Sequence, residues 1–137
     1  MKQKLNVLFI EDDEIEVMKL HRTLNSQGIN HIINEAQDGE EAIKFLRTTT
    51  KLPDLILLDL NMPKMNGIEF LKILKDDKVL KYIPTIILTT SNNRKDVLEC
   101  YKVGIAGYMI KPLKYDDYVE KLTSLFDYWS MNELIKA

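Results

Sequence analysis

Four groups of residues that could do chemistry stand at separate points of the chain. The acids Glu11 and Asp12 follow one apolar segment, and Asp59 follows another. Thr89 and Lys111 each end a further apolar segment. Carboxylates combined with a hydroxyl and an ammonium suit phosphoryl transfer, because the ammonium and the hydroxyl stabilise charge on the phosphoryl oxygens.

Such carboxylates would repel one another if they met, so positive charge must accompany them. Lys111 can supply one charge, and a divalent cation the remainder. No Cys or His stands at these positions, and an all-oxygen ligand set favours Mg²⁺ over a softer metal. One carboxylate can then act as a nucleophile and form an acyl phosphate. Asp59 is the best candidate, since an apolar segment precedes it and a turn follows.

The elements that must position these residues alternate along the chain. Strands are expected over residues 5–10, 31–36, 54–59, 84–89 and 107–110, and helices over 14–28, 38–48, 67–77, 94–104 and from 115 to 128 or 129. The third and fourth strands are apolar on both faces, which is typical of a parallel sheet covered by helices. In such an α/β sheet, the loops at the carboxyl ends of the strands form the binding crevice. The candidate residues therefore converge there.

Each candidate also has a plainer interpretation. Acids after strands often cap helices, and Asp12 or Asp13 could begin the helix over 14–28. Thr89 alone could be a strand-end residue and Lys111 a solvated lysine. Capping does not explain why four different strand ends supply one phosphate-handling set, so the joint pattern favours function.

The length, charge and cysteine count of the chain exclude several classes of protein. The 137 residues fit one domain, and no linker divides them. With 19 basic and 21 acidic residues, the net charge of −2 favours neither nucleic acid nor an anionic membrane as a partner. No apolar run reaches membrane length, and one cysteine allows no internal disulfide. A cytoplasmic protein is expected.

Four motifs occur in an order and at spacings that resemble the receiver domain of two-component response regulators: "LFIEDD", "DLILLDLNMPKMNG", "TIILTTS" and "GYMIKP". The resemblance covers about residues 5–128 and is strongest to small stand-alone receivers. It implies a flavodoxin-like, doubly wound (βα)5 fold with strand order 2-1-3-4-5. It also implies one receiver domain over 1–137, with 130–137 as a C-terminal extension and no output domain.

The resemblance implies a role for each matching residue of the acidic site. Asp59 looks like the aspartate that accepts a phosphoryl group from a histidine kinase or a histidine phosphotransfer protein. Asp12 and Asp59 would bind Mg²⁺ directly, Glu11 through water, and Asn61 through its backbone carbonyl.

Further roles follow from the same likeness. Thr89 resembles the switch hydroxyl, and Tyr108 the aromatic residue that moves inward with it. Lys111 resembles the lysine that pairs with the phosphoryl oxygens, and the Lys111–Pro112 peptide is expected to be cis.

A partner-binding surface is implied by the same family. It is formed by the helix over 94–104, the strand over 107–110 and the last helix, and it would meet an unknown downstream protein. Tyr101, Tyr108 and Tyr115 either share this surface or belong to the core. The chain is expected to be a monomer or a weak dimer.

Two rival functions remain. A phosphohydrolase that forms an aspartyl phosphate usually has a second aspartate two residues after the nucleophile, where this chain has Asn61. A phosphorylation-independent binding module would not need Asp59, Asp12, Thr89 and Lys111 together. The preferred hypothesis is a signalling switch that is not an enzyme, beyond its own phosphorylation and slow dephosphorylation.

Overall fold

Five parallel strands form one sheet in the order β2-β1-β3-β4-β5 in the computed structural model, which describes residues 2–135. The elements follow one another as β1 (Asn6–Ile10), α1 (Glu14–Ser26), β2 (Ile32–Ala36), α2 (Gly39–Thr48), β3 (Leu55–Leu58), α3 (Gly67–Asp76), the short 3-10 helix η1 (Leu80–Tyr82), β4 (Thr85–Thr89), α4 (Arg94–Val103), β5 (Gly107–Ile110) and α5 (Tyr115–Ser130). The expected strand order and α/β class are confirmed.

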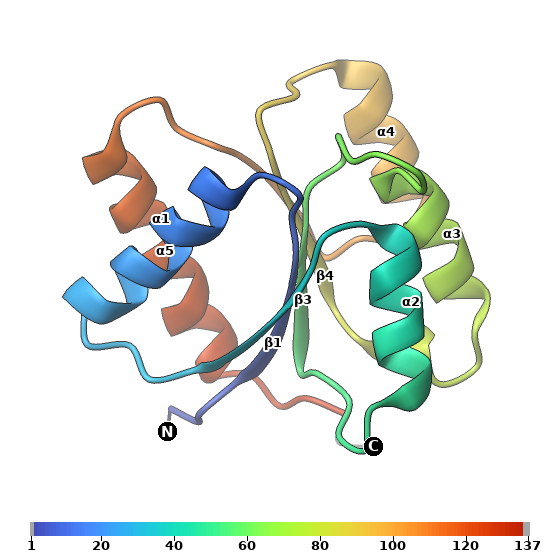
Figure 1. Ribbon diagram of the computed structural model, residues 1–137, viewed down its shortest axis with the longest axis horizontal. Helices are drawn as coiled ribbons and strands as arrows, with labels where there is room; N and C mark the ends of the chain where they lie inside the picture. Colours follow the sequence, from blue (N-terminus) through green and yellow to red (C-terminus); the bar gives the residue numbers. More distant parts are fainter. Residues whose placement is uncertain (1, 136–137) are drawn as a thin grey trace.

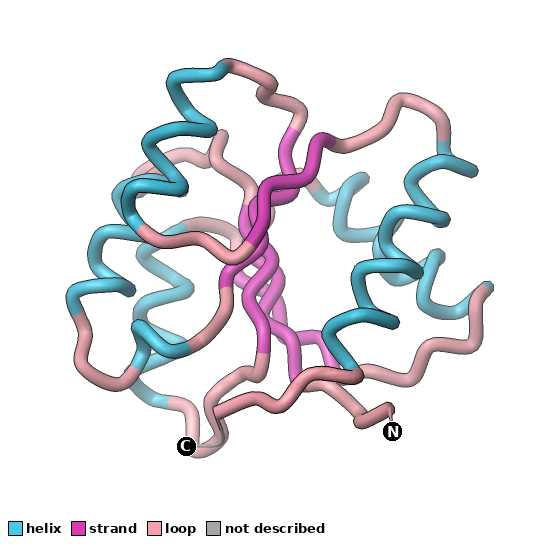
Figure 2. The backbone as a smooth tube through the Cα atoms, turned by 180° about the vertical axis from the view of Figure 1, so that it is seen from behind, coloured by secondary structure: helices cyan, strands magenta, loops and turns pink. Residues whose placement is uncertain are grey.

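Helices cover both faces of the sheet. Figure 1 shows α1 and α5 on one side and α2, α3 and α4 on the other, and Figure 2 shows the same three layers from behind. Because the side chains of a strand alternate between its two faces, β3 contributes residues to two separate hydrophobic cores. Leu55 and Leu57 pack with α1 and α5, whereas Ile56 and Leu58 pack on the opposite side.

The central strands are the most buried part of the sheet. Every residue of β1, β3 and β4 is buried, as expected for parallel strands covered on both faces. The edge strand β2 is only partly buried. The register pairs Ile10 of β1 with Leu58 of β3, so these two strands end side by side. The residues that follow them are thereby brought together.

Local differences from the sequence expectations lie at element ends. The η1 turn was not anticipated, and Asp77 Oδ1 supports it by accepting hydrogen bonds from the backbone N–H groups of Val79 and Leu80. The last helix continues to Ser130, so the segment after it begins at Met131, and residues 136–137 lie outside the described residues. Within residues 2–135, no helix is both long enough and apolar enough to cross a membrane.

Candidate functional site

Asp59 is held at the carboxyl end of β3 by the strand beside it. Its backbone N–H donates to the carbonyl of Ile10 at 3.1 Å, and its side chain is almost fully buried. The four preceding residues of β3 are inaccessible to solvent. The apolar strand therefore fixes where this carboxylate stands.

The loop after Asp59 folds back tightly on it. The Gly67 N–H donates to the carbonyl of Leu60 at 3.1 Å, and a Cβ atom at Gly67 would lie 2.8 Å from the carbonyl oxygen of Asp59. Only glycine allows this approach. Asn66 and Glu69 then form a reciprocal capping box that begins α3. This box was missed, although its N-x-x-E spacing is present in the sequence.

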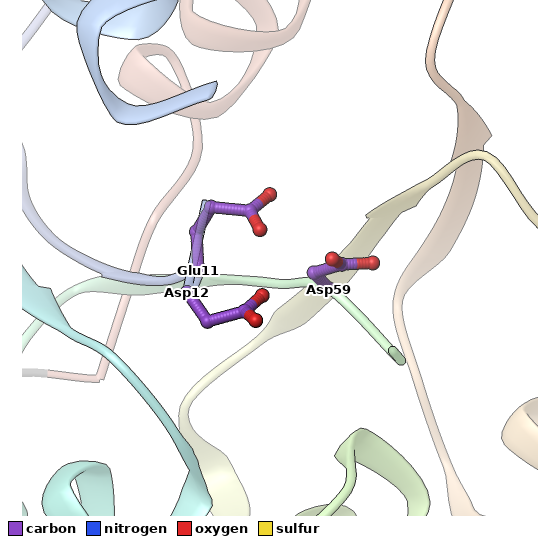
Figure 3. Close-up of side chains that lie close together, drawn as sticks. All are labelled: Glu11, Asp12 and Asp59. Carbon is purple, nitrogen blue, oxygen red and sulfur yellow. The ribbon is translucent and has the colours of Figure 1, made fainter. Parts of the chain in front are cut away.

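Three carboxylates meet at this edge of the sheet. Glu11, Asp12 and Asp59 each offer an oxygen atom, and these atoms lie within 4.8 Å of one another. Figure 3 shows the side chains of Glu11 and Asp12 one above the other, with Asp59 beside them. Glu11 and Asp59 are buried, whereas Asp12 is exposed. Asp13 does not join them, because its Oδ1 accepts from the Ile15 N–H and caps α1.

The donor set fits a hard divalent cation. Carboxylate oxygens crowded in this way are the ligands of Mg²⁺ or Mn²⁺, and no nitrogen or sulfur ligand joins the cluster among the described residues. Asp12 and Asn61 also line a surface cavity of about 570 Å³ beside the cluster, which gives access from solvent. Asp12, Asp59 and Glu11 are therefore the side chains that could hold the ion.

Lys111 brings positive charge to the acids. Its Nζ donates to Glu11 Oε1 at 2.6 Å and lies 3.8 Å from Asp59 Oδ2. The Lys111 backbone N–H donates to the carbonyl of Thr89 at 2.8 Å, so the ends of β4 and β5 are tied together. Lys111 is thus a buried cation and not a solvated one.

Burial and their mutual interaction change the pKa values of both Glu11 and Lys111. Burial raises the pKa of Glu11 to about 7, although the hydrogen bond and charge of Lys111 act in the opposite direction. Burial alone would lower the pKa of Lys111, but its hydrogen bond to Glu11 and the charges of Glu11 and Asp59 outweigh it and raise that pKa. The ammonium therefore stays protonated inside the site.

Thr89 and Tyr108 are linked through one residue. The buried Thr89 Oγ1 accepts from the Ser91 N–H at 3.4 Å, and the Tyr108 hydroxyl donates to the Ser91 carbonyl at 2.8 Å. Burial raises the pKa of Tyr108, and the bond to Ser91 only partly opposes this. The backbone of Ser91 therefore connects the two side chains.

The expected cis peptide between Lys111 and Pro112 is absent. No peptide bond among the described residues is cis, so that prediction was wrong. Proline lowers the cost of the cis form but leaves a preference for trans.

Sequence reasoning missed two acids close to this site. Glu16 Oε2 of α1 lies 3.9 Å from Lys111 Nζ, and Asp96 Oδ2 of α4 accepts from Ser91 Oγ at 2.9 Å. Both are part of ordinary helical patterns, where an acid usually faces solvent. Only the packing of α1 and α4 on opposite faces of the sheet brings each acid near the strand ends.

Comparisons with known proteins agree with this geometry. The family model described as "Response regulator receiver domain" matches residues 7–123. Response regulator Rcp1 of Synechocystis is 32% identical over 128 residues, which are 90% of this chain and 87% of that protein.

Two solved structures also resemble this chain in three dimensions. The phosphorylated cyanobacterial phytochrome response regulator RcpA has a TM-score of 0.89 at 30% identity, covering 96% of this chain and 99% of that chain. The Mn²⁺-bound form of Rcp1 has a TM-score of 0.87 at 30% identity, covering 97% and 99%. Together with the acidic cluster at the sheet edge, these matches show that the chain belongs to the response regulator receiver domain family of two-component signalling.

Proposed function

We propose that this receiver domain is a switch controlled by phosphorylation of Asp59. The observation that carries the proposal is the position of this carboxylate, which lies beside two further acids and 3.8 Å from the buried Lys111 ammonium. Family membership supports the proposal, since receiver domains act in two-component signalling and not as enzymes that turn over external substrates.

The proposed donor is a histidine kinase or a histidine phosphotransfer protein. An Asp59 Oδ atom attacks phosphorus, and the bond from phosphorus to the donor's imidazole nitrogen breaks, with its electron pair staying on the imidazole. Lys111 stabilises the charge on the phosphoryl oxygens, and the Thr89 hydroxyl donates a hydrogen bond to them.

A divalent cation belongs to the same proposal. Asp12, Asp59 and the Asn61 carbonyl would hold Mg²⁺, with Glu11 acting through water. When bound, the cation would neutralise the carboxylates and the phosphoryl oxygens. The Mn²⁺-bound form of Rcp1 supports this assignment.

The output of the switch would pass through Thr89 and Tyr108 to the surface formed by α4, β5 and α5. A groove between α4 and β5 is lined by Leu98, Tyr101 and Tyr108, and the first two are largely exposed. Tyr115 does not line this groove, because it packs against the core on the α1 and α5 side of the sheet, where Arg22 lies over its ring. A downstream protein would therefore contact α4 and β5 first, and phosphorylation would shift the population of binding-competent molecules.

The test is labelling by acetyl phosphate with Mg²⁺, followed by intact mass. The wild-type chain should gain one phosphoryl group, while Asp59→Asn should gain none and chelation of Mg²⁺ should stop labelling. An unmodified wild type, or equal labelling of the variant, would contradict the proposal. Steady hydrolysis of small phosphate esters would instead support the phosphohydrolase alternative.

A further inference from the structure

A carboxylate from outside the acidic cluster lies close to the ammonium of Lys111. Glu16 of α1 places Oε2 at 3.9 Å from Lys111 Nζ, which nearly equals the 3.8 Å from Nζ to Asp59 Oδ2. Glu11 Oε1 holds the same nitrogen at 2.6 Å. Three acids, two that follow β1 and β3 and one in α1, thus lie within 3.9 Å of one ammonium.

A second ammonium group, that of Lys19, also lies beside Glu16. Its Oε2 is buried and makes no hydrogen bond, but Lys19 Nζ lies 3.3 Å from it. That Lys19 ammonium stands 4.5 Å above the ring of Tyr118 in α5. Burial raises the pKa of Tyr118, and the charge of Glu16 raises it further, since a negative charge disfavours the phenolate. The Glu16 side chain is thus only 18% exposed, and its carboxylate lies close to two ammonium groups.

An ordinary surface ion pair would not require this arrangement. A Glu–Lys pair three residues apart on a helix contributes little and can remain in solvent. Here Oε2 is shielded from solvent and lies within 3.9 Å of both Lys19 Nζ and Lys111 Nζ. Glu14, in the same first turn of α1, is exposed. The two acids thus offer a matched comparison on one helix.

We infer that Glu16 is a positioning residue for Lys111, which keeps the ammonium between Glu11 and Asp59, ready to meet an incoming phosphoryl group. A lysine side chain has four flexible carbons, so one partner does not fix its nitrogen. Glu11 and Glu16 both attract the ammonium, and together they would keep it at 3.8 Å from Asp59. This inference rests on the proposed phosphorylation of Asp59.

The experiment compares charge-neutralising variants of the two acids on α1. Glu16→Gln keeps the shape of the side chain and removes its charge, Glu16→Asp keeps the charge, and Glu14→Gln is the matched control. The rate of labelling by acetyl phosphate is measured against donor and Mg²⁺ concentration, and thermal midpoints are recorded alongside.

For Glu16→Gln, we expect the maximal labelling rate to fall about fivefold, because a slightly misplaced catalytic group costs less than the roughly hundredfold loss of a 1 Å error. The half-saturating concentrations of donor and Mg²⁺ should not change. Glu14→Gln should label like the wild type, and Glu16→Asp should regain most of the lost rate.

Three results would overturn the inference alone: a wild-type rate in Glu16→Gln, an equal loss in Glu14→Gln, or no recovery in Glu16→Asp. A wild-type chain that is not labelled would instead overturn the proposed function, and this inference with it. If Glu16→Gln proved unstable, Glu16→Met, which removes the charge without burying an amide, would replace it in the comparison with Glu14→Gln. The same loss of about fivefold would be expected, and a wild-type rate would overturn the inference.

Discussion

At the amino ends of the strands, polar side chains accept short hydrogen bonds from backbone N–H groups, whereas at the carboxyl ends Lys111 bonds to Glu11 but remains beyond hydrogen-bond distance of Asp59. Asp54 Oδ2 accepts from the Asn6 N–H at 2.9 Å, and His31 Nδ1 accepts from the Leu5 N–H at 3.0 Å. At the opposite end, Lys111 stays 3.8 Å from Asp59. At the amino ends, the polar groups have their hydrogen-bond partners within the protein. At the carboxyl ends, the site retains charge and hydrogen-bonding capacity for a ligand.

This difference indicates that the amino ends of the strands contribute mainly to stability, whereas the carboxyl ends contribute mainly to chemistry. A buried polar group that is fully paired stabilises a single conformation, whereas groups held short of contact can move when a new charge arrives. Changes at the carboxyl ends should therefore alter phosphorylation, and changes at the amino ends should alter folding. The following predictions test this division.

The largest effect is expected from Lys111→Met. Removing the only ammonium close to Asp59 among the described residues should slow labelling by acetyl phosphate about a hundredfold, as loss of one charge-stabilising donor does in other active sites. Lys114→Met, an exposed lysine in the same loop, is the control and should label normally. Rates are measured by intact mass, and a Lys111→Met rate within twofold of the wild type would contradict the role of the ammonium.

Asp54→Ala should act on the other end of the sheet. The Asn6 N–H would lose its buried acceptor, which costs about 2 kcal/mol of the free energy of unfolding. Urea denaturation measures the loss, and Asp54→Asn should recover much of it, because an amide oxygen can still accept. The labelling rate of either folded variant should stay at the wild-type value; a slower rate would mean that the two ends are coupled.

His31 should make folding sensitive to mild acid. Burial, followed by the charge of Lys4, lowers the pKa of His31 below 6.5, and its Nδ1 must stay unprotonated to accept from Leu5. The unfolded chain therefore takes up this proton first, so stability falls as the pH drops below about 6.5. The thermal midpoint of His31→Gln should depend less on pH between 7 and 5. An unchanged pH dependence would remove His31 as the cause.

The smallest effect is expected in the loop after Asp59. Lys64 has a φ of 61°, a left-handed conformation that costs a non-glycine residue free energy. Lys64→Gly should stabilise the chain by about 0.5 kcal/mol, since relief of this cost exceeds the added flexibility of glycine. Lys64→Ala keeps the Cβ atom and should change little. Equal unfolding free energies for the two variants would exclude backbone strain as the cause.

The sequence revealed the parts of the molecule that depend on local patterns. The doubly apolar β3 and β4 predicted a covered parallel sheet, and the topology of such sheets predicted that Glu11, Asp59 and Lys111 would meet. These inferences succeeded because apolar patterning determines which strands are central. Once the strands are in order, their carboxyl ends share one edge.

Other features depend on tertiary contacts that no local pattern contains. Glu16 looks like any acid on a helix, and only the packing of α1 against α5 turns it toward Lys111. The Lys111–Pro112 peptide was expected to be cis from family likeness, yet sequence chemistry alone leaves trans favoured. The η1 turn depends on two backbone bonds to the single side chain of Asp77.

The close approach of Gly67 to the backbone of Asp59 has a consequence for how this protein can vary. The loop over residues 59–67 forms a ring, because Gly67 donates to the Leu60 carbonyl and lies against the Asp59 carbonyl. The length of this loop is therefore fixed. An inserted or deleted residue would displace either the proposed phosphoacceptor or the start of α3. Length variation should therefore be tolerated in other loops, whereas this ring changes only by substitution.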